Sequence, residues 1–317
     1  MGIRAQGNPK SSFEDPYAST GTEAWAPYVL PSKWYGTRGT WSGGDGSNVI
    51  DYVTISSTGN ATDFGNLTAS LKAQGGCSNG TKGFAGGGYS SSACRAWINT
   101  FTFATPGNAT SFGDLTVARQ YVAALSDGKR GVWGGGLDGS TKDVMDYADL
   151  ASATNATDFG NLSTATRELA ACANSTRGVF GGGNDGSYEN EMQYITVQTT
   201  GNTTDFGDLT NSVTGAGGMS SAAGRGVFAG GWTGGNTNVI QYITIDTTGN
   251  ATDFGDLLSA TEFGNGCTNG ERGVYGGGTI SSATNVIQYF EVATPGNATD
   301  FGDLTVSRAY AASQAGT

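Results

Sequence analysis

The 317 residues of this chain include no histidine. Histidine is the commonest general base near neutral pH and the commonest metal ligand, so any enzymatic mechanism in this chain would have to do without both. No other set of nucleophile, base and orienting group stands out in the sequence. We therefore predict a protein that is not an enzyme and has no catalytic residues. A glycan-acting enzyme that uses a pair of acidic residues is the remaining enzymatic alternative.

Long apolar runs and clusters of positive charge are also missing. No stretch of about 18 apolar residues exists that could form a membrane-spanning helix, and the first residues lack the apolar core of a secretory signal. Charged residues make up 14% of the chain, and its net charge is −11. Nucleic acids and anionic membranes bind clustered lysine and arginine, so we expect neither partner and no membrane insertion.

What the sequence does contain is a unit of about 47 residues that occurs six times. Its first marker, Gly-Asn-Ala-Thr-Asp-Phe-Gly-Asp-Leu and close variants, is centred on Phe64, Phe112, Phe159, Phe206, Phe254 and Phe301. Its second marker, a basic residue, glycine, three residues and two glycines, starts at Arg38, Lys82, Arg130, Arg177, Arg225 and Arg272. Fixed periods of this length are typical of solenoids and propellers.

Each unit reads as four short antiparallel strands, A to D. Runs of β-branched and aromatic residues are bounded by Gly and Asn, which suit tight turns. Strand A is rich in small residues, strand B ends in a double glycine, strand C is apolar on both faces, and strand D carries the marker phenylalanine. Four-stranded sheets repeated around an axis form a β-propeller. We predict an all-β, six-bladed propeller over residues 36–317, preceded by an extended arm over residues 1–35.

The ends of the repeat region indicate how the ring closes. The propeller begins at residues 36–44 with a strand B that lacks its strand A. The chain ends, after Arg308, with a strand A that lacks the rest of its blade. The C-terminal strand is therefore expected to complete the first blade.

The double glycine of strand B and the length of the unit resemble those of kelch-like, galactose-oxidase-type propellers. A tyrosine also recurs in strand C, at Tyr52, Tyr147, Tyr194, Tyr242 and Tyr289. The regularly placed tryptophan of kelch units is missing, so the repeat has its own consensus. The copper chemistry of galactose oxidase does not carry over, because no histidine is present to hold the metal.

Two features could bind metal ions. Asp63, Asp158, Asp205, Asp253 and Asp300 recur in the first marker and offer the oxygen ligands that Ca²⁺ takes. No Asp-x-Asp-x-Asp-Gly loop accompanies them, so we favour hydrogen bonds to local backbone and predict no cofactor, with Ca²⁺ as the alternative.

Three of the four cysteines, Cys77, Cys172 and Cys267, share one position of strand A in alternate units. Other units place Leu125, Met219 or Gln314 there. We interpret the position as a buried apolar slot, with a threefold thiolate metal site on the axis as the alternative.

The loops between strands B and C vary most among the units. In an antiparallel blade they lie on one face of the propeller together with the connections from strand D to the next strand A. Recognition usually takes place on loops held by a rigid scaffold. Tyr89, Trp97, Tyr188 and Trp232 are the candidate binding residues there, and exposed aromatic rings of this kind suit sugars or proteins. Neutral drift of surface loops is the alternative.

Residues 1–35 share no repeat and hold four of the six prolines. Their aromatic residues are Phe13, Tyr17, Trp25, Tyr28 and Trp34. We predict that this arm anchors the chain to a partner through these side chains, with an arm packed on its own propeller as the alternative.

The arm, the near-identical units and the acidic surface together resemble those of bacteriophage virion proteins. This resemblance implies a decoration, head-fibre or tail-fibre component on the virion surface, bound to other virion proteins. A lectin-like adhesin that binds host glycans is the alternative function. Formation of a homo-oligomer is left open.

Overall fold

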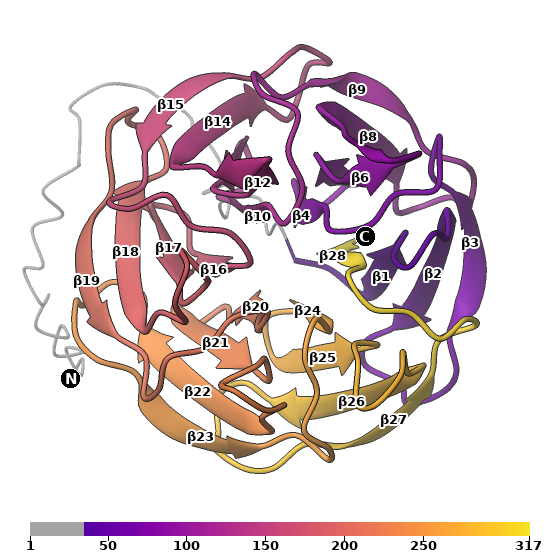
Figure 1. The fold of residues 1–317 in the computed structure, drawn as a ribbon. Coiled ribbons are helices and arrows are strands. Elements are labelled where there is room, and N and C mark those ends of the chain that lie inside the picture. The colour runs from indigo at the N-terminus through magenta and orange to yellow at the C-terminus, as the bar shows by residue number, and fades with distance from the viewer. Residues whose placement is uncertain (1–34) are drawn as a thin grey trace, which may run out of the picture. The chain divides into compact units, whose positions relative to one another are not determined.

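The computed structural model describes residues 35–317, which form a six-bladed β-propeller with no α-helix among them (Figure 1). Each repeat unit supplies four antiparallel strands, and the six sheets surround a central channel lined by the A strands. The described residues thus hold no helix that could cross a membrane. The arm residues Phe13, Tyr17, Trp25, Tyr28 and Trp34 lie outside the described part of the chain.

From the axis outward, the blades contain the following strands. Blade 1 is β28 (Ala312–Gly316), β1 (Arg38–Ser42), β2 (Val49–Thr54) and β3 (Thr62–Asn66). Blade 2 is β4 (Gly75–Ser78), β5 (Lys82–Gly86), β8 (Trp97–Thr102) and β9 (Thr110–Asp114). Blade 3 is β10 (Ala123–Ser126), β11 (Arg130–Gly134), β14 (Val144–Asp149) and β15 (Thr157–Asn161).

The second half of the ring follows the same plan. Blade 4 is β16 (Ala170–Ala173), β17 (Arg177–Gly181), β18 (Glu191–Thr196) and β19 (Thr204–Asp208). Blade 5 is β20 (Gly217–Ser220), β21 (Arg225–Ala229), β22 (Val239–Thr244) and β23 (Thr252–Asp256). Blade 6 is β24 (Asn265–Thr268), β25 (Arg272–Gly276), β26 (Val286–Glu291) and β27 (Thr299–Asp303).

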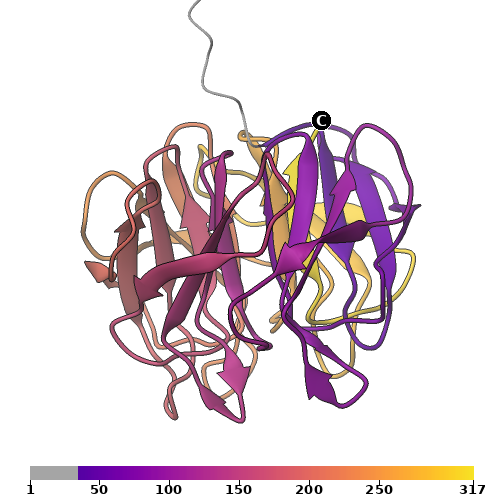
Figure 2. The ribbon, with the colours of Figure 1, turned by 90° about the horizontal axis from the view of Figure 1, so that it is seen from above.

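The two ends of the channel open on different faces. Two B–C loops form short hairpins, β6 (Tyr89–Ser90) with β7 (Ala93–Cys94) and β12 (Leu137–Asp138) with β13 (Ser140–Thr141). The C-terminus lies at the opposite end of the propeller from these hairpins (Figure 2). There Thr317 donates its backbone N–H to the carbonyl of Gly80, in the A–B turn of blade 2. We call the two ends the B–C face and the A–B face.

The predicted closure of the ring is confirmed. Strand β28 pairs along its whole length with β1, from Arg38 opposite Gly316 to Ser42 opposite Ala312. The side chain of Gln314 is buried at this seam, where Thr40 Oγ1 donates to its Oε1 at 3.0 Å and its Nε2 donates to Ser42 Oγ at 3.2 Å. The first blade therefore differs from the others by a polar contact between its terminal strand and its neighbour.

The first sequence marker joins neighbouring blades at the outer rim. In all six units its asparagine accepts a hydrogen bond through Oδ1 from a backbone N–H in strand D of the preceding blade, at 3.0–3.1 Å. The accepting residues are Asn60, Asn108, Asn155, Asn202, Asn250 and Asn297. These asparagines therefore have a structural role that explains the recurring Asn-x-Thr pattern.

The basic residue of the second marker also contacts the next blade. Arg130, for example, donates to the carbonyl of Val197 at 3.1 Å, and Arg177 does the same to Ile245 at 3.0 Å. The same guanidinium group of Arg130 lies 4.2 Å from the ring centroid of Tyr147 in its own strand C, a cation–π distance. This arrangement recurs in five blades, and Lys82 replaces the arginine in blade 2.

Strand C departs from the expectation that both of its faces are apolar. Its third residue is polar and buried in every blade, at Asp51, Asn99, Asp146, Gln193, Gln241 and Gln288. A β-bulge precedes each of them. The side chains hold the incoming D–A connection, as when Gln193 Oε1 accepts the N–H of Ser163 at 2.8 Å. A buried polar group is stable only with such partners.

In blades 1 and 3 this position forms a buried ion pair. Arg308 Nη2 lies 2.8 Å from Asp51 Oδ2, and Arg119 Nη1 lies 2.6 Å from Asp146 Oδ2. All four side chains are completely buried. The arginine stands where other units have Leu71, Thr166, Val213 or Thr261. Units with an arginine at this position thus have an aspartate as the third residue of strand C. Units with an uncharged residue at this position have an asparagine or a glutamine there.

The side-chain hydrogen bonds of Gln314 at the seam predict that the protein loses stability when Gln314 is replaced by an apolar residue. Gln314→Leu copies the side chain of Leu125 but leaves the buried Thr40 and Ser42 hydroxyls without their side-chain partner. We expect a loss of about 1–3 kcal/mol in the free energy of unfolding, measured by urea titration. The triple variant Thr40→Val, Ser42→Ala, Gln314→Leu should recover most of it, and equal stability of the single and triple variants would contradict this role.

The ion pair of blade 3 gives a second prediction. Asp146→Ala leaves the buried guanidinium group of Arg119 uncompensated and should cost about 3–5 kcal/mol of unfolding free energy. The paired change Arg119→Thr with Asp146→Gln copies blade 4 and should restore much of the loss. If the paired variant is no more stable than Asp146→Ala in urea, the two residues do not depend on each other as described.

Candidate functional site

A closed ring of backbone hydrogen bonds surrounds the propeller axis on the B–C face. Each blade contributes one residue, located just before strand A. The six residues are Ala73, Tyr121, Glu168, Gly215, Phe263 and Tyr310. Each donates its N–H to the carbonyl of its counterpart in the preceding blade, at 2.8–3.1 Å. The bond from Ala73 to Tyr310 completes the circle, and we call these residues the axial ring.

All six residues of the axial ring have a left-handed backbone, with φ between 53° and 64°. Glycine adopts this conformation freely, but Gly215 is the one glycine in the ring. For other residues it costs roughly 1–2 kcal/mol. Such strain persists where surrounding structure determines it and is concentrated at functional sites. Here the hydrogen bonds of the ring hold the backbone in the left-handed conformation.

Aromatic side chains of the ring gather at the mouth of the channel. Phe263 and Tyr310 stack with ring centroids 4.3 Å apart, and Tyr121 meets Tyr310 edge-on at 5.9 Å. Ala73 lies between the two tyrosines in ring order, and its small side chain lets them meet. Gly215 makes room for Phe263, because a Cβ at this glycine would come within 2.5 Å of the phenylalanine ring. The ring residues line a cavity of about 70 Å³, which we call the axial mouth.

Carboxylates give the axial mouth a negative field. Glu168 Oε2 accepts from Thr214 Oγ1 at 2.8 Å, and its Oε1 lies 3.6 Å from Arg167 Nε. Burial and the charge of Glu168 raise the pKa of Glu262. The pKa of Tyr310 is raised by burial first, and further by Tyr121 and by the carboxylates of Glu262, Glu168 and Asp45. A negative charge is thus disfavoured at Tyr310 and at Glu262.

A wider hollow lies beside the mouth between blades 1 and 2. It measures about 400 Å³ and is lined in part by Asp45, Lys72 and Tyr89. Lys72 Nζ lies 6.0 Å from the ring centroid of Tyr89 and 5.8 Å from that of Tyr310. The structure therefore places Tyr89, one of the predicted binding residues, next to an axial ring that sequence reasoning did not identify.

Two other predicted binding residues, Tyr188 and Trp232, meet directly. They lie in the B–C loops of blades 4 and 5, and Trp232 Nε1 donates to the Tyr188 hydroxyl at 2.9 Å. Tyr188 is 40% exposed. Trp232 is half-buried. An exposed and a half-buried aromatic side chain joined in this way present apolar surface and a polar edge, a combination suited to sugars and proteins.

Trp97 is not part of either group. It is the first residue of β8 rather than a loop residue, is 39% exposed, and lies under the guanidinium group of Arg95 at 4.7 Å. Its shallow hollow also includes Thr68 and Asn99. The four predicted residues therefore fall in three separate places.

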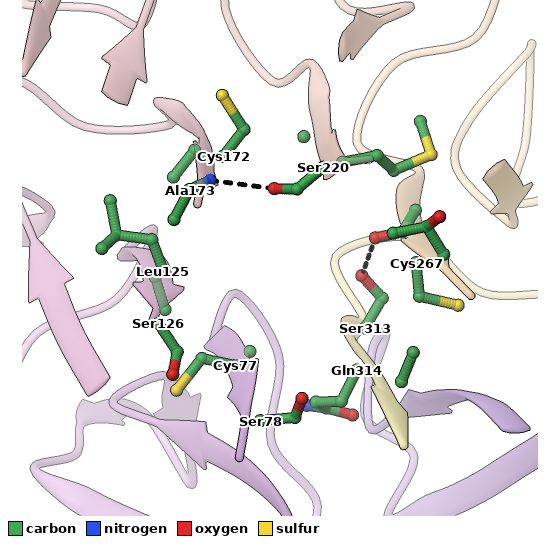
Figure 3. Close-up of a pocket in the computed structure, with 18 of the residues that line it drawn as sticks. Cys77, Ser78, Leu125, Ser126, Cys172, Ala173, Ser220, Cys267, Ser313 and Gln314 are labelled. Atoms are coloured by element: carbon green, nitrogen blue, oxygen red, sulfur yellow. Dashed lines mark hydrogen bonds between the residues drawn. The ribbon is translucent and has the colours of Figure 1, made fainter. Parts of the chain in front are cut away.

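The other end of the channel, toward the A–B face, contains the cysteine slot (Figure 3). The sulfur atoms of Cys77, Cys172 and Cys267 point away from the axis and from one another (Figure 3). All three are free and buried, and burial raises the pKa of Cys267 to about 12. Each sulfur packs against the strand B glycine of a neighbouring blade, and a Cβ at Gly39 would lie 2.6 Å from Cys267 Sγ. This geometry agrees with a small apolar slot and does not support a thiolate metal site.

Glu189 lies beside Asp185 and Glu191, and burial together with these neighbours raises the pKa of Glu189. Within residues 35–317, no group of three or more Cys, Asp or Glu side chains is placed to hold a metal ion. The recurring aspartates of the first marker are exposed, and Asp63 Oδ1 accepts the N–H of Gly65 at 3.2 Å. This bond is of the local type expected for these residues.

One feature of the sequence indicates the axial ring. Its position is occupied by five different residue types in six units, although the adjoining markers are nearly constant. Position-specific variation in the D–A connection, rather than in the B–C loops alone, indicates it. No protein-family model matches the chain, and no curated protein matches it by sequence.

The cysteines give a prediction about thiol reactivity. A disulfide reagent should modify one thiol per native chain, Cys94, which is half-buried and donates to the carbonyl of Leu137. Burial and the nearby charge of Asp138 raise the pKa of Cys94, so the reaction should be slow at neutral pH and accelerate with rising pH. Cys94→Ser should abolish the reaction of the native protein. In denaturant, all four thiols of the unchanged protein should react. Fast reaction of two or more native thiols would be inconsistent with this packing.

Proposed function

We propose that this protein is a non-enzymatic structural and interaction protein of a virion surface, a capsid decoration, head-fibre or tail-fibre component with a kelch-like propeller. Residues 1–35 attach it to another virion protein. The supporting observation is the polarity of the propeller. Tyr35, the first residue that the structure describes, lines the channel cavity of the A–B face, whereas Tyr188 and Trp232 lie in loops of the B–C face. Attachment at the A–B end leaves the B–C face free for a partner.

The distribution of sequence variation supports the same proposal. Asparagine, arginine and glycine markers that join neighbouring blades are almost the same in every unit, whereas the B–C loops and the axial ring differ. Binding residues commonly lie on loops that a rigid scaffold positions. The acidic charge and the absence of histidine agree with display and binding rather than catalysis.

A second function, binding of host surface glycans, is favoured by the pair formed by Tyr188 and Trp232. Aromatic rings pack on the apolar faces of sugars, and the hydrogen bond between these two side chains holds their relative position. Display on a virion and glycan binding are compatible, because they use opposite faces of the propeller.

Attachment is tested by co-sedimentation with virions that lack this protein. Full-length protein should sediment with them, and a variant with Phe13, Tyr17, Trp25, Tyr28 and Trp34 changed to serine should lose more than about tenfold in affinity, because buried aromatics dominate interfaces. Trp232→Ala, on the opposite face, should attach normally. Absence of co-sedimentation, or equal binding by the arm variant, would disprove the anchoring role.

Glycan binding is tested with labelled polysaccharide from the host surface. Trp232→Ala should weaken binding by about tenfold or more, and Tyr188→Phe, which keeps the ring but removes the hydroxyl acceptor, should weaken it less. Leu258→Ala provides the control, since this leucine is an exposed apolar residue, 52% accessible, in a D–A connection. Unchanged binding by Trp232→Ala would exclude the pair as a sugar site.

A further inference from the structure

The axial mouth combines two properties that favour a positively charged ligand. Its aromatic wall consists of Tyr121, Phe263 and Tyr310, held close together at 4.3 and 5.9 Å. Phe263 and Tyr310 cover one face of each other in this stack. Ring faces outside the stack carry negative quadrupole charge and attract cations within about 6 Å. Glu168 lines the same cavity, and Glu262 is the residue before Phe263 in the chain. Aromatic faces and carboxylates act in the same direction.

The charges around the mouth are not balanced. Glu168 has Arg167 beside it, but Glu262 forms no ion pair with any described residue. Asp45 adds a third carboxylate to the field at Tyr310, and its Oδ2 accepts the backbone N–H of Ala309 at 2.7 Å. Three carboxylates therefore face two cationic side chains, Arg167 and Lys72. The excess of negative charge repels anionic ligands and does not attract neutral ones.

The protein itself places an ammonium group against this wall. Lys72 Nζ lies 5.8 Å from the ring centroid of Tyr310 on the side of the neighbouring hollow. The aromatic surface is thus compatible with an alkylammonium group at cation–π distance. Neither Phe263 nor Tyr121 has a cationic side chain at cation–π distance among residues 35–317.

The size and stiffness of the mouth restrict what enters. Its volume of about 70 Å³ is well below the ~300–1,000 Å³ of pockets that enclose whole small molecules. A head group therefore fits, while the rest of its carrier stays outside. Gln74 also lines the cavity, and both atoms of its buried side-chain amide lack a hydrogen-bond partner. The hydrogen-bonded axial ring holds the wall in place before binding, which lowers the entropic cost of binding.

We propose that the axial mouth is a binding site for an organic ammonium head group, of the quaternary or alkylated amine class. Phe263, Tyr310 and Tyr121 supply the aromatic contact, and Glu262 and Glu168 supply the countercharge. This site is separate from the pair formed by Tyr188 and Trp232. It does not depend on how residues 1–35 are anchored.

The test is calorimetric titration of the full-length protein with choline and with 3,3-dimethyl-1-butanol, a neutral molecule of the same shape. Choline should bind at least about tenfold more tightly, because the neutral compound lacks the charge that the rings and carboxylates attract. Equal binding of the two compounds, or no measurable binding of choline, would overturn the proposal. Neither result depends on virions or host glycans, so the proposed function is tested separately.

Variants locate the site. Glu262→Gln should weaken choline binding about fivefold, and Phe263→Leu, which keeps an apolar side chain, should weaken it to a similar extent. Glu271→Gln is the matched control, because it makes the same charge change at an exposed residue in the A–B turn of blade 6. Urea unfolding of each variant verifies that it is folded. Choline affinity that is the same in Glu262→Gln as in the control would refute the assignment.

Discussion

The closed ring of six backbone hydrogen bonds around the axis is the constraint on which the channel mouth at the B–C face depends. It can form only when all six blades are present, because every residue in it is both donor and acceptor to its two neighbours. Tyr310 makes two of these hydrogen bonds and lies two residues before β28, the strand that completes blade 1. Pairing of the two ends of the chain therefore also brings Tyr310 to the position where it completes the axial ring. The ring in turn keeps Tyr121, Glu168 and Phe263 in a backbone conformation that their side chains disfavour.

The repeat divides its residues between two tasks. Constant positions hold neighbouring blades together through many small contacts, such as the asparagine that accepts from the preceding strand D and the glycine that receives the side chain of the cysteine slot. These contacts recur at every interface, so no blade is independent of the next. Positions that differ among the units include the B–C loops and the axial ring, and also buried positions such as the slot of Cys77, Leu125 and Gln314. The buried differences are accommodated by local packing. The differences on the B–C face are the ones on which the binding proposals rest.

The sequence was sufficient for the architecture and insufficient for the site. The period of the unit, the double glycine of strand B and the incomplete first and last units predicted six blades and their closure by the C-terminal strand. The contact of Trp232 with Tyr188 was not predictable, because it depends on how two loops in adjacent blades are oriented. The pairing of Arg119 with Asp146 was hidden because Asp146 lies in a strand that reads as apolar and Arg119 lies in a separate D–A connection. The axial ring was hidden for another reason: glycine is the usual sign of a left-handed backbone, and Gly215 is the one ring residue that carries it.

Hydrogen exchange of the six ring amides, followed residue by residue in the native full-length protein, is the most direct test of this constraint. A closed ring requires that all six amides exchange slowly and with the same free energy of opening, close to that of global unfolding, although they lie at the mouth of an open channel. Exchange of these amides within seconds, or a clear difference in protection between one arc of the ring and the rest, would show that the ring does not close and that the aromatic mouth is not held in place.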